Sequence, residues 1–225
     1  MKNLIELQKL KKSYSENQVL TGLDLKIEYG KVTSIIGPNG SGKTTLFKLI
    51  LGISEPDSGI IIRDPGKSIG FLIEDLIPYE RLSLTDNLRA FSLISDKNIS
   101  RADIKEVVSV SFTEKIKSKT IRSLSAGQKR KALFAVSLLG DPDILILDEP
   151  LNSLDLKERI DILSSVRYLK ESKNKTILIS SHDLASLYEI SDIFCFIKNG
   201  RVEKELTKKE MSPDQINSVF MELYG

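Results

Sequence analysis

A glycine-rich segment between two apolar runs constrains the fold of this chain more than any other part of its sequence. The segment GPNGSGKTTL, residues 37–46, follows the run VTSII and leads into TLFKLILG. It fits the pattern Gly-x-x-x-x-Gly-Lys-[Ser/Thr] between a predicted strand and a predicted helix. A chance match in a chain of 225 residues is on the order of one per cent, which disfavours an ordinary glycine turn. The segment therefore predicts a loop that binds phosphate.

The residue types of this loop are those that phosphate binding requires. Glycines let backbone N–H groups converge on phosphate oxygens, and a helix that begins near Lys43 directs its positive dipole end at them. Lys43 would bring a mobile charge to the β- and γ-phosphates, and Thr44 could place its hydroxyl on Mg²⁺. We expect burial of the lysine to make sense only with nucleotide bound. The predicted nucleotide-binding residues here are Gly37, Pro38, Asn39, Gly40, Ser41, Gly42, Lys43, Thr44 and Thr45.

Composition limits the class of protein. Hydrophobic residues make up 40% and charged residues 28% of the chain, which is typical of a globular protein. The net charge of +2 gives no field that favours nucleic acid, so no nucleic-acid partner is expected. The single Cys195 and the lack of a signal-peptide pattern favour a cytosolic location. The apolar runs are far shorter than the roughly 20 residues that span a bilayer.

The pattern of predicted elements indicates an α/β fold. Apolar and β-branched runs predict strands at residues 2–8 and 23–28 and in VTSII. Later in the chain, the buried strands DILILD and TILISS alternate with helical segments, which is typical of a parallel sheet covered by helices on both faces. Thr85 and Ser100 are predicted to be helix N-caps in the segment between these regions. The AsnGly pair at 199–200 predicts a hairpin.

An acidic pair at a strand end supplies the second half of the predicted site. ILILDEP places Asp148 and Glu149 at the carboxyl end of a buried strand, where ligands bind in open α/β sheets. Asp148 would hold Mg²⁺ with Thr44, and Glu149 would act as general base toward water. Taken alone, such a pair could equally be a solvated turn. His182 also follows a strand and could reach the γ-phosphate, although a lone histidine is more often structural. The predicted catalytic residues are Glu149, His182 and Lys43.

Three further motifs carry a family resemblance. LSAGQKR at 124–130, DEPLNSLD at 148–155 and SSHD at 180–183 follow the phosphate loop in order, and together they resemble the nucleotide-binding domain of ATP-binding cassette (ABC) transporters. The resemblance covers roughly residues 3–205. The family signature is usually LSGGQ, so Ala126 is a departure at one small residue.

The resemblance implies a P-loop NTPase fold with three parts: a mostly parallel central sheet flanked by helices, an N-terminal antiparallel β subdomain and a small α-helical subdomain. One ABC-type domain would span residues 1–225. The expected ranges are antiparallel β at 1–30 and 58–70, a nucleotide-binding core at 31–57 and 140–205, a helical lobe at 75–139 and a terminal helix at 206–225.

The resemblance also implies ATP and Mg²⁺ as ligands and a head-to-tail dimer, in which the signature of one chain closes on the phosphate loop of the other. Ser125, Gly127 and Gln128 lie at the start of a predicted helix, whose N-terminus suits an anion. Asp155 would contact the partner across the interface. Tyr14 would stack on adenine, against the alternative that it only packs at a strand end.

One position departs from the family in a way that bears on function. Most relatives have a glutamine after the strand IGFL, where it contacts Mg²⁺ and water, but this chain has Glu74. A carboxylate can still bind Mg²⁺, but it cannot donate a hydrogen bond. The pattern with Glu74 at this position resembles the branch of the family that exports bacitracin-like and lantibiotic peptides. The apolar loop that follows, residues 75–84, is either a docking site for a membrane partner or ordinary lobe packing.

The leading functional hypothesis is an ATPase subunit at the inner face of the cell membrane that powers transport by a separately encoded membrane protein. Export is the expected direction of this transport. The subunit would work as a homodimer or as a heterodimer with a second ABC ATPase subunit. The alternative is an ABC-type ATPase that acts on ribosomes or DNA, and a third reading is an inactive regulatory cassette. Lys43, Asp148, Glu149 and His182 are all present, which argues against the inactive cassette.

Overall fold

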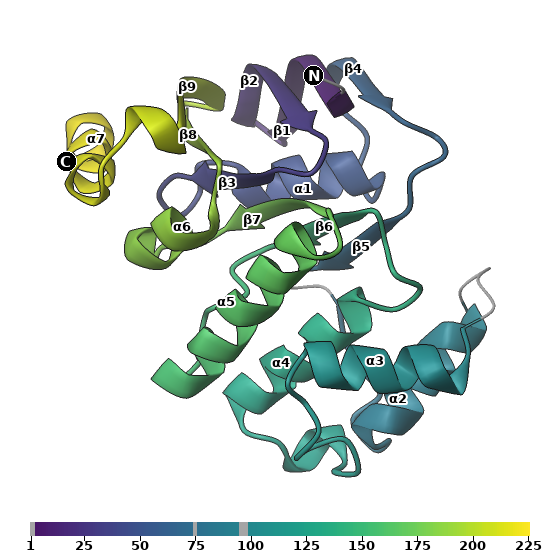
Figure 1. Ribbon diagram of the computed structural model, residues 1–225. Helices are drawn as coiled ribbons and strands as arrows, with labels where there is room; N and C mark the ends of the chain where they lie inside the picture. Colours follow the sequence, from purple (N-terminus) through teal and green to yellow (C-terminus); the bar gives the residue numbers. More distant parts are fainter. Residues whose placement is uncertain (1–2, 74–75, 95–98) are drawn as a thin grey trace.

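The computed structural model describes residues 3–73, 76–94 and 99–225. Two sheets form its framework (Figure 1). An antiparallel sheet has the strand order β2-β1-β4, and a larger sheet has the order β5-β6-β7-β3-β8-β9. In the larger sheet every pairing is parallel except that of β8 with β9. This arrangement confirms the α/β fold expected from the sequence.

The antiparallel sheet is longer than the sequence pattern predicts. Its strands are β1 (Asn3–Tyr14), β2 (Asn17–Glu28) and β4 (Ser58–Arg63). The register of β1 shifts between Leu7 and Leu10, and Lys9 has a φ of 50°. This bulge turns Leu10 back into the core, so the segment KLKK continues the strand that alternation alone ends at residue 8.

The strands of the larger sheet are short and buried. They are β3 (Val32–Ile36), β5 (Ile69–Leu72), β6 (Ile144–Leu147), β7 (Thr176–Ser180), β8 (Ile193–Lys198) and β9 (Arg201–Thr207). β5 pairs with β6, so residues 69–70, which we expected in the antiparallel part, belong to the parallel sheet. The hairpin at Asn199 and Gly200 is confirmed, with φ of 51° and 72°.

Helices cover both faces of the larger sheet (Figure 1). They are α1 (Lys43–Leu51), α2 (Leu84–Ile94), α3 (Arg101–Val110), α4 (Ala126–Ser137), α5 (Leu156–Glu171), α6 (Leu184–Ile190) and α7 (Pro213–Tyr224), with short 3₁₀ turns at Ile121–Ser123 and Lys208–Glu210. α1 lies between the two sheets, where Leu46, Phe47 and Ile50 join one apolar core. The other helices share a second core on the opposite face of the parallel sheet.

One of the two predicted helix caps is correct. Ser100 caps α3, with its side chain accepting from the Asp103 amide and the Asp103 side chain accepting from the Ser100 amide. The prediction of Thr85 as a cap is wrong, because α2 already includes it. Ser83 Oγ accepts from the Asp86 amide at 3.1 Å instead, and Thr85 Oγ1 donates to the Lys117 carbonyl at 3.0 Å. Across the described ranges, every helix is too short or too polar to cross a bilayer.

Candidate nucleotide site

The glycine-rich loop forms a turn of left-handed backbone between β3 and α1. Gly40 and Gly42 have φ of 80° and 100°, which side chains rarely tolerate. Gly37 has no room for a side chain, because a Cβ would lie 2.5 Å from Ser41 Oγ and 2.9 Å from the Ile197 carbonyl oxygen. α1 begins at Lys43 with no side-chain cap. Its first amides therefore face the loop, as anion binding at a helix N-terminus requires.

Lys43 is buried and already has partners in its own loop. Its Nζ donates to the Gly37 carbonyl at 2.7 Å and to the Pro38 carbonyl at 3.0 Å. We expected the buried lysine to have a partner for its charge only when nucleotide is bound. This expectation is wrong, because two backbone carbonyls already accept hydrogen bonds from the ammonium. Burial lowers the pKa of Lys43, while the charges of Glu149 and Asp148 oppose that shift. A phosphate would replace neutral carbonyls with a full negative charge.

Asp148 joins the phosphate loop to two neighbouring strands. Thr44 Oγ1 donates to its Oδ2 at 2.5 Å, and Ser180 Oγ donates to its Oδ1 at 2.6 Å. The same Ser180 oxygen accepts from the Glu149 amide at 2.9 Å. Thr44 and Asp148, predicted as a metal pair, are thus in direct contact. Ser180 was not predicted, although its place in SSHD after a buried strand marks it.

Glu149 holds its carboxylate in a confined place. Its φ is 47°, and its carboxylate lies 2.9 Å from His182 Nε2, as measured from Oε1. That contact has the distance of an ion pair without the alignment of a hydrogen bond, and no aligned donor reaches either carboxylate oxygen from the part of the chain described. Burial raises the pKa of Glu149, while the charges of His182 and Lys43 counter it. The group suits a base that must take a proton from water.

Arg130 is a residue that sequence reasoning missed. Its Nη2 donates to the Asp148 carbonyl and, at 2.8 Å, to the Glu149 carbonyl. It therefore ties α4 to the backbone of the acidic pair. Its position two residues after Gln128 in LSAGQKR was the available signal, but only the fold shows which strand end it reaches.

A pocket of about 620 Å³ unites these groups at the carboxyl ends of the parallel strands. Lys43, Thr44, Asp148, Glu149 and His182 line it together. The pocket also takes in Ala126 of the signature and residues to which the sequence assigned no role, namely Asn17, Val19, Arg130, Asn152 and Ser153.

Other predicted residues lie around this pocket. Tyr14 does not line it; the residue is 46% exposed, and Lys12 Nζ lies 5.5 Å from the centroid of its ring. Ser125 caps α4, with its side chain accepting from the Gln128 amide. Asp155 caps α5 by accepting from the Glu158 amide at 2.8 Å. Glu74 lies outside the described residues, so its predicted role stays a prediction.

The donor set fits a magnesium nucleotide. Ser41 Oγ is buried with no hydrogen-bond partner among the described residues, next to the amides of the loop. Thr44 and Asp148 offer two oxygens, which suits Mg²⁺ because this ion is usually bound by few protein ligands together with substrate phosphates and water. The described part of the chain has no cluster of three His, Cys, Asp or Glu side chains that would form a closed metal site.

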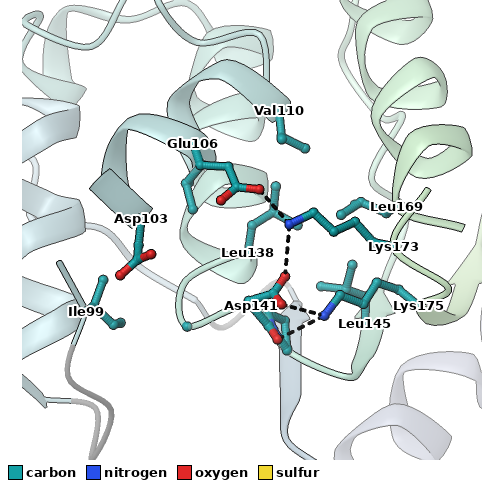
Figure 2. Close-up of a pocket in the computed structure, with 13 residues that line it drawn as sticks. Ile99, Asp103, Glu106, Val110, Leu138, Asp141, Leu145, Leu169, Lys173 and Lys175 are labelled. Atoms are coloured by element: carbon teal, nitrogen blue, oxygen red, sulfur yellow. Dashed lines mark hydrogen bonds and ion pairs between the residues drawn. The ribbon is translucent and has the colours of Figure 1, made fainter. Parts of the chain in front are cut away.

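A second pocket, of about 190 Å³, lies at the opposite end of the parallel strands (Figure 2). Its cations are committed to ion pairs: Lys173 Nζ lies 2.6 Å from Glu106 Oε1, and Lys175 Nζ lies 3.0 Å from Asp141 Oδ2. The pocket also sits at the amino ends of β6 and β7, away from the phosphate loop. We therefore assign it to the joint between α3 and the sheet, and not to the nucleotide.

Comparisons with known proteins show which proteins this chain is similar to. The family model described as ABC transporter matches residues 20–152. The lantibiotic transport ATP-binding protein SrtF of Streptococcus pyogenes is 33% identical over 230 residues, covering 97% of this chain and 98% of the relative. The zinc import ATP-binding protein ZnuC of Rickettsia bellii is 33% identical over 214 residues, covering 95% and 90%. The solved structure of cbiO1 from Clostridium perfringens, at 28% identity, aligns with a TM-score of 0.81 over 99% of this chain and 96% of that one.

Proposed function

The chain belongs to the ABC transporter family and is an ATP-binding, ATP-hydrolysing subunit, and we propose that it powers transport by a separate membrane protein. The observation that carries this proposal is the convergence of Lys43, Asp148, Glu149 and His182 on one pocket. Support also comes from two relatives of nearly full length, which are named as transport and import ATP-binding proteins.

The chain's own side chains account for the hydrolytic step. Lys43 releases the Gly37 and Pro38 carbonyls and pairs with the β- and γ-phosphates, which keeps the terminal phosphate in place for in-line attack. Glu149 accepts a proton from the attacking water, and His182 holds the carboxylate at 2.9 Å. Mg²⁺, bound by Thr44 and Asp148, would supply charge neutralisation at the phosphates.

The subunit works as a head-to-tail dimer in this proposal. The start of α4, where Ser125 is exposed, would contact the phosphate loop of a partner. Asp155 is exposed at the start of α5, after the acidic pair, and would contact the partner across the same interface. Tyr14 is exposed and would stack on adenine. One chain supplies a single phosphate loop and a single signature, so complete sites need two chains.

Export as the direction of transport rests on Glu74 alone. The comparisons do not choose a direction, because a lantibiotic transport protein and a zinc import protein share the same 33% identity with this chain.

A docking surface for the membrane protein is available on the helical layer. Ile77 and Tyr79 are 76% and 49% exposed, and Leu93 on α2 is 87% exposed. The Tyr79 ring lies 5.7 Å from the Phe91 ring, which connects the loop to α2. Large apolar groups that are exposed in this way favour a protein contact over packing within the lobe. The subunit would then lie on the cytoplasmic side of the membrane.

The experiment that tests this proposal is capture from native membranes. A tagged Glu149→Gln chain, which should hold ATP without hydrolysing it, is incubated with detergent-solubilised membranes, and bound proteins are identified by mass spectrometry. Recovery of one polytopic membrane protein, lost when Ile77 and Tyr79 carry charged substitutions, is the expected result. Recovery of ribosomal or DNA-associated proteins alone would contradict the transport role.

A further inference from the structure

Tyr224, at the end of α7, joins a helix on the outside of the molecule to the base of the phosphate loop. Its hydroxyl donates to the Ile197 carbonyl oxygen at 2.8 Å and also lies within hydrogen-bond reach of the Ile36 carbonyl oxygen, at 3.2 Å. Ile36 is the last residue of β3 and directly precedes Gly37. Both carbonyls belong to buried residues of neighbouring parallel strands, β3 and β8. The hydroxyl therefore sits where the β3–β8 pairing gives way to the phosphate loop.

The Ile197 carbonyl, which accepts from Tyr224, also packs against the first residue of the phosphate loop. It packs so closely against Gly37 that a Cβ there would lie 2.9 Å from the Ile197 oxygen. The Gly37 carbonyl in turn accepts from Lys43 Nζ at 2.7 Å. A continuous series of contacts thus runs from Tyr224 through Ile197 and Gly37 to the lysine that binds phosphate. Close packing leaves little room for the Ile197 carbonyl to shift without moving Gly37.

The helix that carries Tyr224 is firmly seated. Ile216 and Val219 of α7 are buried in the larger core, and the Phe220 ring lies 4.8 Å from the Tyr224 ring. α7 packs beside α6 (Figure 1), which begins two residues after His182. Burial raises the pKa of the Tyr224 hydroxyl, so the hydroxyl stays protonated and remains a donor. α7 thereby holds the donor in a fixed place relative to the ends of β3 and β8.

We propose that Tyr224 is a positioning residue for ATP binding, which fixes the Ile197 and Ile36 carbonyls and through them the conformation of the phosphate loop. It touches no nucleotide itself. Without its hydroxyl, the two buried carbonyls lose their shared donor, and the base of the loop gains freedom that nucleotide binding must remove. The effect is on affinity for the phosphate groups and not on the chemical step, because Glu149 and His182 lie outside this series of contacts.

The test compares Tyr224→Phe with Tyr188→Phe. Each removes one hydroxyl from the α6–α7 layer, but the Tyr188 hydroxyl donates to the Met211 carbonyl at 3.1 Å, away from the loop. Calorimetry gives the Kd for ATP and for tripolyphosphate, and steady-state assays give KM and kcat. Since one hydrogen bond is at stake, we expect Tyr224→Phe to weaken both ligands by about threefold to tenfold, with kcat within about twofold of the parent. Tyr188→Phe should leave both affinities unchanged.

Hydrogen exchange of the amides at 37–43 supplies a readout that does not depend on activity. Exchange there should be faster in Tyr224→Phe than in Tyr188→Phe when both are compared without nucleotide and at temperatures where circular dichroism shows both to be folded. Unchanged ATP affinity in Tyr224→Phe would overturn the proposal. Equal loss of affinity in both variants would also overturn it, because the effect would then belong to packing of the layer.

Discussion

At the scale of single residues, the site contains one buried carboxylate, that of Glu149, whose hydrogen bonding is incomplete among the described residues. Glu149 combines a positive φ of 47° with a carboxylate that no aligned donor reaches among the described residues. A non-glycine residue in this region costs roughly 1–3 kcal/mol and persists only where the surroundings impose it. The Ser180 hydroxyl and the Arg130 guanidinium fix the backbone on both sides of Glu149. The strain therefore serves to aim the carboxylate into the pocket, where the proposed base must lie.

Glu149→Gln should abolish turnover while leaving ATP binding intact. The amide has nearly the same shape but accepts no proton, and loss of a general base costs about 100-fold to 10,000-fold in rate. Phosphate release measures kcat, and calorimetry measures ATP affinity. Glu106→Gln, which changes a carboxylate in the pocket at the opposite end of the parallel strands, is the control and should keep its activity. Normal hydrolysis by Glu149→Gln would show that another group is the base.

Residue-level prediction from the sequence goes furthest where the chemistry is local. Roles for the phosphate loop, Thr44 and Asp148 could be predicted because their residue types and spacing carry the chemistry, and the structure places Thr44 in contact with Asp148. The Lys43 bonds to two carbonyls, the Arg130 contact and the Tyr224 contact could not, since each depends on backbone atoms. Every residue has a backbone carbonyl, so no sequence pattern shows which carbonyl a given side chain will reach in the folded chain.

At the scale of elements, the short parallel strands β5 and β6 are joined by a side-chain clamp, the contacts of Asp143 with Lys67 and Ser68. Asp143, just before β6, accepts from the Ser68 amide and hydroxyl at 3.0 Å each and from Lys67 Nζ at 2.7 Å, just before β5. The clamp sets the register in which β5 and β6 begin. The sequence pattern predicted these buried strands but not the clamp, whose halves are 75 residues apart. The same limit explains β1, where the bulge at Lys9 is decided by pairing with β2 and β4.

Asp143→Asn should lower the free energy of unfolding at pH 7 and reduce how much of it is lost in acid. Burial would raise the pKa of Asp143, but the bonds from Lys67 and Ser68 outweigh burial and lower it from 3.8 to about 2. A lowered folded-state pKa gives stability that is fully present above pH 4 and lost as the pH falls toward 2. Loss of the ion pair and weakening of the hydrogen bonds should cost about 1–2 kcal/mol at pH 7.

Urea unfolding between pH 2 and pH 7 measures this effect. The variant should show a flatter loss of stability between pH 4 and pH 2 than the parent, whereas Glu55→Gln, on an exposed loop, should follow the parent curve. A parallel shift of the whole Asp143→Asn curve, with the acid slope kept, would mean that titration of this carboxyl does not contribute.

At the scale of the whole molecule, the parallel sheet gathers residues from distant segments along one edge. Lys43 follows β3, Asp148 and Glu149 follow β6, and His182 follows β7. Because the strands are parallel, their carboxyl ends meet, and this is why the sequence order of strand and polar residue predicted that these side chains lie together. In the proposed dimer, the signature at the start of α4 of one chain completes the pocket of the other. The head-to-tail dimer is therefore a prediction that belongs to the scale of the whole molecule.

Mixing two inactive variants tests the head-to-tail dimer directly. Lys43→Ala removes the phosphate-binding charge, and Ser125→Arg blocks the signature. In a head-to-tail heterodimer, one site combines both defects while the other has an intact phosphate loop from one chain and an intact signature from the other. With random pairing and independent sites, the mixture should recover about a quarter of the parent ATPase rate, since half of the dimers carry one complete site of two.

The control mixture pairs Lys43→Ala with Glu149→Gln. Both defects then lie on the same side of a site, so every dimer has two defective sites and no activity should return. Circular dichroism must show that Ser125→Arg is folded, because Ser125 also caps α4. No recovery in the first mixture, with both variants folded and the parent chain active alone, would contradict complementary sites formed between two copies. Recovery in both mixtures would mean that the phosphate loop and the base need not belong to the same site, which would contradict the pocket that unites Lys43 with Glu149.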